Sequence, residues 1–580
     1  MPQVMFPDAK ITVSVPAGTL LIDAIRQAGL SVDAPCGGRG RCGKCAVHVL
    51  HGSAASIELS CQFPVMEDLQ VCLPDTSMKG HILESGMGKT DLSSPNVYSV
   101  NAKIPAPQIG ESDSICRRVK DTLNLSQPIP LSLSTNLYHT LKELDFTGDF
   151  VLVGDRLSDI RKDKTPCYIL AYDIGTTTVV SYLLDSATGR QLSVSSMLNP
   201  QTTYGADVIS RCEYDTSHQG KELTRLIRST LNTLMLSNAQ KAGISPEDIF
   251  FAVIVGNTCM EHLYLGVSTE SLISAPYLAT VDEIQFLTPS EAQLSIHPEG
   301  RIAVLPSISG FVGGHTVGVL LSLPEDTFDK MTLILDIGTN GELVLGRGKE
   351  LYTCSTAAGP AFEGAKIACG MRGTDGAIDH AFVKDGELSF TTVGNLPPAG
   401  ICGSGLIDLI RCLLELGIIS ARGRMEKPSK WLPEAAARYS QRLTQINGVS
   451  AFLLTDDPKG IYLSQKDIRE VQLAKAAIAT GVTLLCEQFH VQPEAIQSVL
   501  LAGACGNYMA PESACQIGLI PACLKDRIHP IGNAAGEGAK MAALNRNILE
   551  RASHIAKHIN FVELATSKTF QTAYLQNLNF

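Results

Sequence analysis

The 580-residue sequence has few aromatic side chains and no long apolar run. Tryptophan occurs once and aromatic residues make up 6% of the chain, so the stacking platforms that bind single-stranded nucleic acids are scarce. The formal net charge is −11, which argues against the basic face that a phosphate backbone requires, and nucleic acid is not an expected partner. Because no run of about 18 apolar residues occurs, we expect no membrane span.

Signals for export and for two common nucleotide loops are also missing. The N-terminal residues contain no basic stretch followed by an apolar one, so no secretory signal peptide is expected. The 17 cysteines are mostly scattered, unlike the framework of a small disulfide-rich secreted protein. These features predict a protein of the reducing cytoplasm. Neither a P-loop nor a Gly-x-Gly-x-x-Gly dinucleotide motif after an early strand is found.

What is present indicates a folded protein of several domains. Hydrophobic residues make up 44% of the chain and charged residues 18%. At roughly 100–200 residues a domain, the length predicts about three to five domains. We assign residues 1–88 to a first domain, 89–103 to a polar linker, 104–165 to a small middle domain, and 166–580 to an α/β domain with a C-terminal extension.

Local patterns predict the elements of the first two domains. Alternation of apolar and polar residues predicts strands over 10–15 and 46–50, and the apolar spacing predicts a helix over 20–28 that Thr19 caps. In the middle domain, short apolar runs predict strands at 128–133 and 149–153.

One group of cysteines has the spacing of an iron–sulfur site. Cys36, Cys42 and Cys45 form a glycine-rich C-x5-C-x2-C pattern, and Cys61 follows. Four thiolates hold a [2Fe–2S] cluster, and glycines let backbone N–H groups approach its sulfides. Zinc is the alternative metal, but zinc sites usually use two C-x2–4-C pairs. Cys72 also competes for the fourth position; we prefer Cys61, because Cys72 lies in an alternating strand pattern.

This segment resembles the plant- and vertebrate-type [2Fe–2S] ferredoxins, with the x5 spacing of the adrenodoxin branch. The resemblance implies an α+β β-grasp fold and one-electron transfer.

An Asp-Ile-Gly-Thr sequence occurs twice, at 173–176 and 336–339, each time between apolar strand patterns. A tight glycine turn directs N–H groups at phosphate oxygens, and a carboxylate suits hydrated Mg²⁺. The repeat predicts a duplicated α/β core with a cleft between two lobes. The candidate magnesium ligands are Asp173 and Asp336, and Glu342 either orients the attacking water or lies at the surface. The candidate phosphate-binding residues are Gly175, Thr176, Thr177, Gly338, Thr339 and Asn340.

Later glycine-rich stretches complete a nucleotide-type pattern. Residues 400–405 lead into an apolar helix pattern, residues 499–507 read as a strand that ends in a glycine turn, and residues 532–539 would let helices or lobes pack closely. Such turns allow the backbone to lie against an adenine ring and its α-phosphate. The candidate residues here are Gly403, Ser404, Gly405, Gly503 and Gly506. In this order the motifs resemble the phosphate-1, phosphate-2, adenosine and connecting motifs of the acetate/sugar kinase–Hsp70–actin superfamily.

A ferredoxin-like segment in front of such a core resembles the ATP-dependent reductive activators of corrinoid proteins. The stretches 199–201 with 204–207, 255–258 and 358–365 are also similar to that family. The family commonly has an acidic residue where this chain has His315 and a phenylalanine where it has Cys505.

The resemblance implies the activity and the partners. It implies reduction of an inactive Co(II) corrinoid protein to Co(I), with electrons passing through a [2Fe–2S] cluster and with ATP and Mg²⁺ as further cofactors. The implied partners are the corrinoid protein of a methyltransferase system and a ferredoxin- or flavodoxin-type electron donor, and a homodimer stays open. The alternatives are an ATP-driven electron donor to another low-potential acceptor, a small-molecule kinase, and a redox-sensing regulator.

Overall fold

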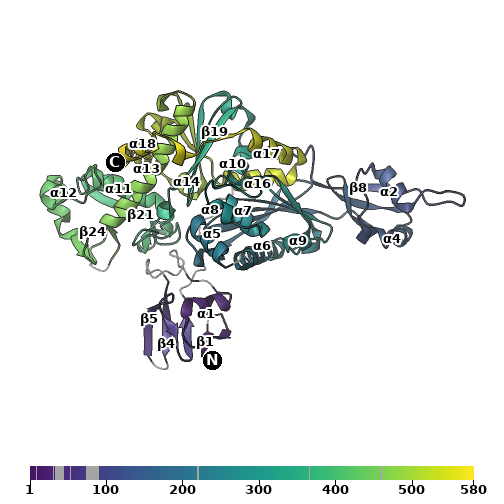
Figure 1. The fold of residues 1–580 in the computed structure, drawn as a ribbon, viewed down its shortest axis with the longest axis horizontal. Coiled ribbons are helices and arrows are strands. Elements are labelled where there is room, and N and C mark those ends of the chain that lie inside the picture. Colours follow the sequence, from purple (N-terminus) through teal and green to yellow (C-terminus); the bar gives the residue numbers. More distant parts are fainter. Residues whose placement is uncertain are drawn as a thin grey trace.

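The computed structural model describes residues 1–7, 9–30, 32, 45–51, 54–73, 91–218, 221–364, 366–457 and 460–580. A central two-lobed body carries a small domain at one end and the N-terminal domain beside its first lobe (Figure 1). The observed parts therefore match the expected fold class: a β-grasp-like α+β domain, a small middle domain and a duplicated α/β core.

The N-terminal domain is a five-stranded sheet in the order β2-β1-β7-β4-β5, covered by one helix. The helix α1 (Leu21–Gln27) is amphipathic and buries its apolar face in the domain core. Thr19 does not cap it, because Thr19 pairs with Val65 in a two-stranded ribbon and Leu20 takes the cap position. The strands are β1 (Gln3–Phe6), β2 (Ile11–Ser14), β3 (Thr19–Leu20), β4 (Ala46–His51), β5 (Ala54–Leu59), β6 (Pro64–Val65) and β7 (Leu69–Cys72).

The middle domain is a three-stranded sheet in the order β10-β9-β8 with short helices. The run 149–153 lies within β9 (Thr147–Val153), as predicted. The strand predicted at 128–133 is wrong: helix α3 (Leu131–Ser134) forms there, because Pro128 and Pro130 have no N–H to donate to a sheet. The remaining elements are β8 (Val97–Lys103), β10 (Arg156–Arg161), α2 (Ile115–Leu123) and α4 (Leu137–Glu143).

Much of the stretch expected to be a linker is ordered. Residues 97–103 form β8 and pair with β9 throughout. Just before β8, the Asn96 amide donates to the carbonyls of Ala542 and Ala543 at 2.8 and 2.9 Å. The Asn96 side chain thus binds the start of the middle domain to α16 (Ala534–Leu544), near the C-terminal end of the core.

The core contains two six-stranded sheets of matching topology. In the first, β11 (Tyr168–Ile174) is antiparallel to β12 (Thr178–Asp185) and parallel to β14 (Ile249–Gly256). In the second, β17 (Thr332–Ile337) is antiparallel to β18 (Gly341–Arg347) and parallel to β26 (Ser498–Ala502). The duplication predicted from the repeated turns is confirmed. The other strands are β13 (Gln191–Leu198), β15 (Gln285–Leu287) and β16 (Arg301–Val304) in the first sheet, and β19 (Glu350–Thr356), β27 (Ile528–Pro530) and β28 (Asn560–Phe561) in the second.

Helices cover both sheets, and none of the helices described is long and apolar enough to cross a membrane. The first lobe carries the short helix η1 (Pro200–Thr203), α5 (Val208–Ser217), α6 (Lys221–Ala242), α7 (Thr258–Leu265), α8 (Glu270–Ile273), α9 (Pro289–Ala292) and α10 (Gly314–Ser322). The remaining helices are α11 (Gly403–Glu415), α12 (Pro433–Tyr439), α13 (Gln465–Gln488), α14 (Gly503–Tyr508), α15 (Pro511–Gln516), α16 (Ala534–Leu544), α17 (Arg546–His558) and α18 (Phe570–Gln576). Two three-stranded sheets complete the second lobe: β20 (Ala377–Lys384) with β21 (Glu387–Thr392) and β22 (Gly400–Ile401), and β23 (Leu443–Ile446) with β24 (Val449–Leu453) and β25 (Tyr462–Ser464).

Helix α16 follows the second lobe in sequence but packs against α10 and the sheet of the first lobe. A Cβ atom on Gly538 would lie 1.8 Å from the carbonyl oxygen of Gly318, so only glycine permits this close crossing. The close packing predicted for 532–539 is therefore present. The C-terminal residues return to the core as expected, through α17 on α10 and α18 on α13.

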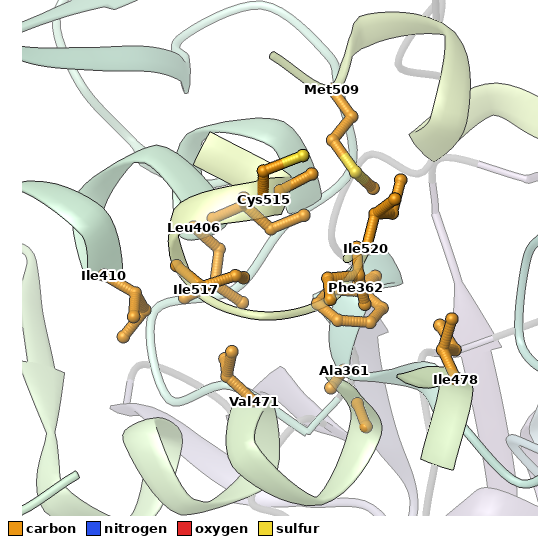
Figure 2. Close-up of a cluster of buried hydrophobic side chains, with 14 of the residues drawn as sticks. Ala361, Phe362, Leu406, Ile410, Val471, Ile478, Met509, Cys515, Ile517 and Ile520 are labelled. Atoms are coloured by element: carbon orange, nitrogen blue, oxygen red, sulfur yellow. The ribbon is translucent and has the colours of Figure 1, made fainter. Parts of the chain in front are cut away.

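The second lobe has its own apolar core, which fixes a loop at the cleft. Figure 2 shows Phe362 and Ala361 among side chains of α13, α11 and the segment after α15. Phe362 is 2% exposed, and Ile478 and Leu406 belong to the same buried cluster. The buried Phe362 therefore anchors the backbone next to Glu363.

Candidate nucleotide and cluster sites

The two Asp-Ile-Gly-Thr turns occupy equivalent places in the two lobes. Asp173 lies near the end of β11, and residues 175–177 form the turn into β12. Asp336 lies near the end of β17, and residues 338–340 form the turn into β18. Asp336 pairs with Glu342 across the second hairpin, whereas Asp173 pairs with Val180 across the first. Opposite the aspartate, the second hairpin thus has a glutamate where the first has a valine.

A single carboxylate connects the two turns. The hydroxyl groups of Thr177 and Thr339 both donate to Oε2 of Glu363, at 2.5 and 2.9 Å. These are two of the hydroxyls that the sequence assigned to phosphate binding. An anionic oxygen therefore already sits where hydroxyls of both lobes converge, which is the place expected for a phosphate group.

Sequence reasoning missed Glu363, although the stretch around it was singled out as similar to a family motif. A glutamate after a buried phenylalanine was the available signal, but its partner Thr177 is 186 positions away in sequence. No local pattern reports such a contact.

Buried acids surround the turns, and His315 lies among them. Burial raises the pKa of Asp336 to about 7, against the opposing charge of His315, and burial also raises the pKa of Asp173. Burial raises the pKa of Glu261 to about 7 as well. Burial alone would lower the pKa of His315, but the carboxylates of Glu342 and Asp336 more than offset this and raise it to about 10. A protonated His315 thus balances part of the negative charge.

Glu342 is not a surface residue, because it is only 5% exposed. Its Oε2 lies 3.4 Å from Nε2 of His315, and Nδ1 of His315 contacts the carbonyl of Gly256 at 2.9 Å. The histidine therefore connects β14 of the first lobe to β18 of the second. The surface alternative for Glu342 is therefore wrong, and its role in orienting the attacking water stays a prediction.

The later glycine motifs lie beside the second turn and the loop that carries Glu363. Gly503 starts α14 with φ of +80°, and a Cβ atom there would lie 2.7 Å from Oδ1 of Asp336. Gly403 begins α11 directly against the carbonyl of Phe362, 2.0 Å from an added Cβ atom. Ser404 and Gly405 follow in the first turn of α11, and Gly506 lies in α14. The structure thus brings the second turn, the Glu363 loop and both motifs together.

Two of the four expected cluster ligands also meet. Sγ of Cys45 lies 3.2 Å from Sγ of Cys61, and both side chains are buried in the N-terminal domain. Cys36 and Cys42 lie outside the described residues, so their positions stay a prediction. Cys72 ends β7 and pairs with His48 of β4. Two adjacent buried thiols suit a thiolate-bound cluster, and they favour Cys61 as the fourth ligand.

Comparisons with known proteins cover the whole chain. Residues 5–69 match a 2Fe-2S iron-sulfur cluster binding domain, residues 168–324 match the RACo middle region, and residues 330–580 match the C-terminal domain of RACo, the ASKHA domain. The chain is 34% identical to the corrinoid activation enzyme RamQ of Eubacterium limosum, over 100% of this chain and 99% of that protein. The chain belongs to the RACo family.

Two further relatives agree with this membership. A solved structure of a reductive activator for a corrinoid, iron–sulfur protein superposes with a TM-score of 0.76 at 29% identity, covering 100% of this chain and 98% of the other. A reductase of Methanosarcina barkeri that acts on the Co(II) form of a methylated amine-specific corrinoid protein is 25% identical over 71% of this chain and 77% of its own length. For a RACo family member, the cofactors that these sites fit are a [2Fe–2S] cluster in the N-terminal domain and ATP with Mg²⁺.

Proposed function

We propose that this enzyme uses ATP to drive the one-electron reduction of a corrinoid protein from inactive Co(II) to Co(I). The observation that carries the proposal is the convergence of Thr177 and Thr339, one from each lobe, on one anionic oxygen. This geometry supports polyphosphate binding between the two lobes. The matched cluster-binding domain in the same chain supports electron transfer as the purpose.

The redox part of the proposal concerns the N-terminal domain. Cys36, Cys42, Cys45 and Cys61 would hold the [2Fe–2S] cluster, which supplies one-electron transfer when bound. We propose a reduced ferredoxin- or flavodoxin-type protein as the electron donor, since such donors exchange single electrons. Reduction to Co(I) is uphill from ordinary donors, and each ~59 mV of deficit costs about tenfold in a one-electron equilibrium.

The nucleotide part concerns the cleft. The hydroxyls of Thr177 and Thr339 donate to phosphate oxygens once Glu363 has moved aside. Asp173 and Asp336 would hold Mg²⁺, directly or through water, and Glu342, which His315 contacts, would orient the attacking water. ATP can drive the uphill step only by having different affinities for two arrangements of the protein.

Anaerobic visible spectroscopy tests this function. A Co(II) corrinoid protein of a methyltransferase system is mixed with the enzyme and a reductant, with and without Mg-ATP. We expect Co(I) only when ATP is present. The Asp336→Ala variant should lose ATP turnover while the visible spectrum of its cluster is unchanged; turnover retained in this variant would refute the magnesium role, and Co(I) formed equally without ATP would refute the coupling.

A further inference from the structure

Helix α1 of the N-terminal domain contacts the first lobe at one arginine. Nη2 of Arg26 donates to the carbonyl of Thr203 at 2.5 Å, and the guanidinium lies 4.5 Å from the centre of the Tyr204 ring. Asp23, one turn earlier on α1, holds Nη1 of the same arginine at 2.9 Å. In Figure 1, α1 lies on the side of its domain that faces α5. Arg26 is thus oriented within its own domain and bound to the first lobe.

Arg26 contacts the segment 199–211, which is hydrogen-bonded to the first Asp-Ile-Gly-Thr turn. The Asn199 amide donates to the carbonyl of Gly175 at 2.9 Å, and the Asn199 N–H donates to the carbonyl of Thr177 at 2.9 Å. The remaining carbonyl of the turn, that of Thr176, accepts from Nη2 of Arg211 at 2.5 Å. All three carbonyls of the turn are therefore bound by side chains or backbone of the segment 199–211.

Arg211 links the turn to the residues that Arg26 contacts. Its Nε donates to the carbonyl of Gly205 at 2.9 Å, one residue after Tyr204, and its side chain is fully buried. Tyr204 is held in turn by an edge contact with Tyr214, at 4.7 Å between ring centres. A continuous series of hydrogen bonds and ring contacts thus links Arg26 to the turn at residues 175–177.

The planar peptide unit couples the contacts of these carbonyls to phosphate binding, because each carbonyl and the following N–H move together. The carbonyls of residues 175–177 share planar peptide units with the N–H groups of residues 176–178, and those N–H groups are the ones predicted to face phosphate. A peptide that rotates to direct its N–H at a phosphate must also move its carbonyl. Because Asn199 and Arg211 bind those carbonyls, any such rotation also moves the surface on which Arg26 docks.

We propose that Arg26 is a positioning residue that makes the docking of the cluster domain on the first lobe depend on bound nucleotide. The proposal deepens the proposed function and rests on it: nucleotide at the first turn sets where the cluster domain sits. Because coupling between two binding events is reciprocal, loss of the Arg26 contact must also change nucleotide affinity by the same factor.

Hydrogen exchange of the α1 amides, in the full-length cluster-loaded protein under anaerobic conditions, tests the proposal. Exchange is measured with and without a saturating non-hydrolysable Mg-ATP analogue, in the wild type and in the Arg26→Ala and Arg26→Lys variants. Arg117→Ala is the matched control, since Arg117 is an exposed arginine paired with an aspartate four residues before it, in the middle domain.

In the wild type and the control, the analogue should change α1 exchange by about fivefold or more, the lower end of typical couplings. Arg26→Ala should bind the analogue, with an affinity altered by a similar factor, and show no change in α1 exchange. Arg26→Lys should restore part of the response, because lysine can still donate to Thr203. An unchanged α1 exchange in the saturated wild type, or a full response in Arg26→Ala, would overturn the proposal. No corrinoid protein enters this experiment, so its result is independent of whether Co(I) forms in the assay of the proposed function.

Discussion

The carboxylate of Glu363 occupies the place where a phosphate is expected. ATP must therefore displace this carboxylate in order to bind. We predict that replacing this carboxylate by the isosteric amide, in Glu363→Gln, tightens the binding of Mg-ATP. The side chain keeps its shape, and its amide oxygen can still accept both hydrogen bonds. It loses the negative charge that strengthens the bonds from Thr177 and Thr339 and that repels a phosphate.

The size of the effect follows from these two contacts. A hydrogen bond to a charged group contributes about 1.5–3 kcal/mol, against roughly 1 kcal/mol for a neutral pair. When ATP displaces the carboxylate, the two threonines regain charged acceptors, so only part of the difference appears as binding energy. A net gain near 1.4 kcal/mol corresponds to about tenfold in the dissociation constant.

Titration calorimetry with a non-hydrolysable Mg-ATP analogue measures this constant directly. The control is Glu415→Gln, which makes the same chemical change on α11 of the same lobe, where the carboxylate is exposed and pairs with Arg411. The control should bind like the wild type. An unchanged or weaker affinity in Glu363→Gln would refute the reasoning, since it would mean that the carboxylate contributes to nucleotide binding instead of opposing it.

Three other predictions concern the cluster, the cleft and the second lobe. Cys61→Ser should lower the iron content per chain and alter the visible spectrum, whereas Cys72→Ser should keep both; iron lost with Cys72→Ser alone would reverse the assignment. Gly503→Ala should slow ATP hydrolysis and leave the cluster spectrum unchanged, because φ of +80° and a Cβ atom 2.7 Å from Asp336 cost about 1–3 kcal/mol; hydrolysis at the wild-type rate would contradict it. Burial lowers the pKa of Lys475 from 10.5 to about 8, so between pH 8 and 10.5 the unfolded state binds more protons and stability rises with pH. Relative to Lys475→Met, thermal unfolding should show the wild type gaining about 3 kcal/mol over this range, and a constant difference would exclude the shift.

The sequence predicted both Asp-Ile-Gly-Thr turns as local elements, and the structure explains why. Each Asp-Ile-Gly-Thr turn is a short hairpin connection whose residues are contiguous, so its pattern is complete in one stretch of sequence. Gly503 was recognised as part of a glycine turn, whereas its close approach to Asp336 was not predicted.

The contacts that join distant segments could not be predicted. Arg26 meets Thr203 across 177 positions and Glu363 meets Thr177 across 186, and neither arginine nor glutamate carries a local signal for its partner. Within one stretch, the strand expected at 128–133 failed for a different reason: its apolar residues were counted, but the prolines between them cannot pair in a sheet.

The crossing of α10 and α16 has a consequence for how the chain folds as it is synthesised. The apolar core of the first lobe includes Ala539, Ala542 and Leu549, which emerge from the ribosome at least 235 residues after the last strand of the first-lobe sheet, which ends at Val304. Protein synthesis proceeds at about 5–20 residues per second, so one face of that sheet stays uncovered for on the order of ten seconds or more. Truncation within α16 would therefore disable the first lobe, although the deleted residues lie at the other end of the sequence.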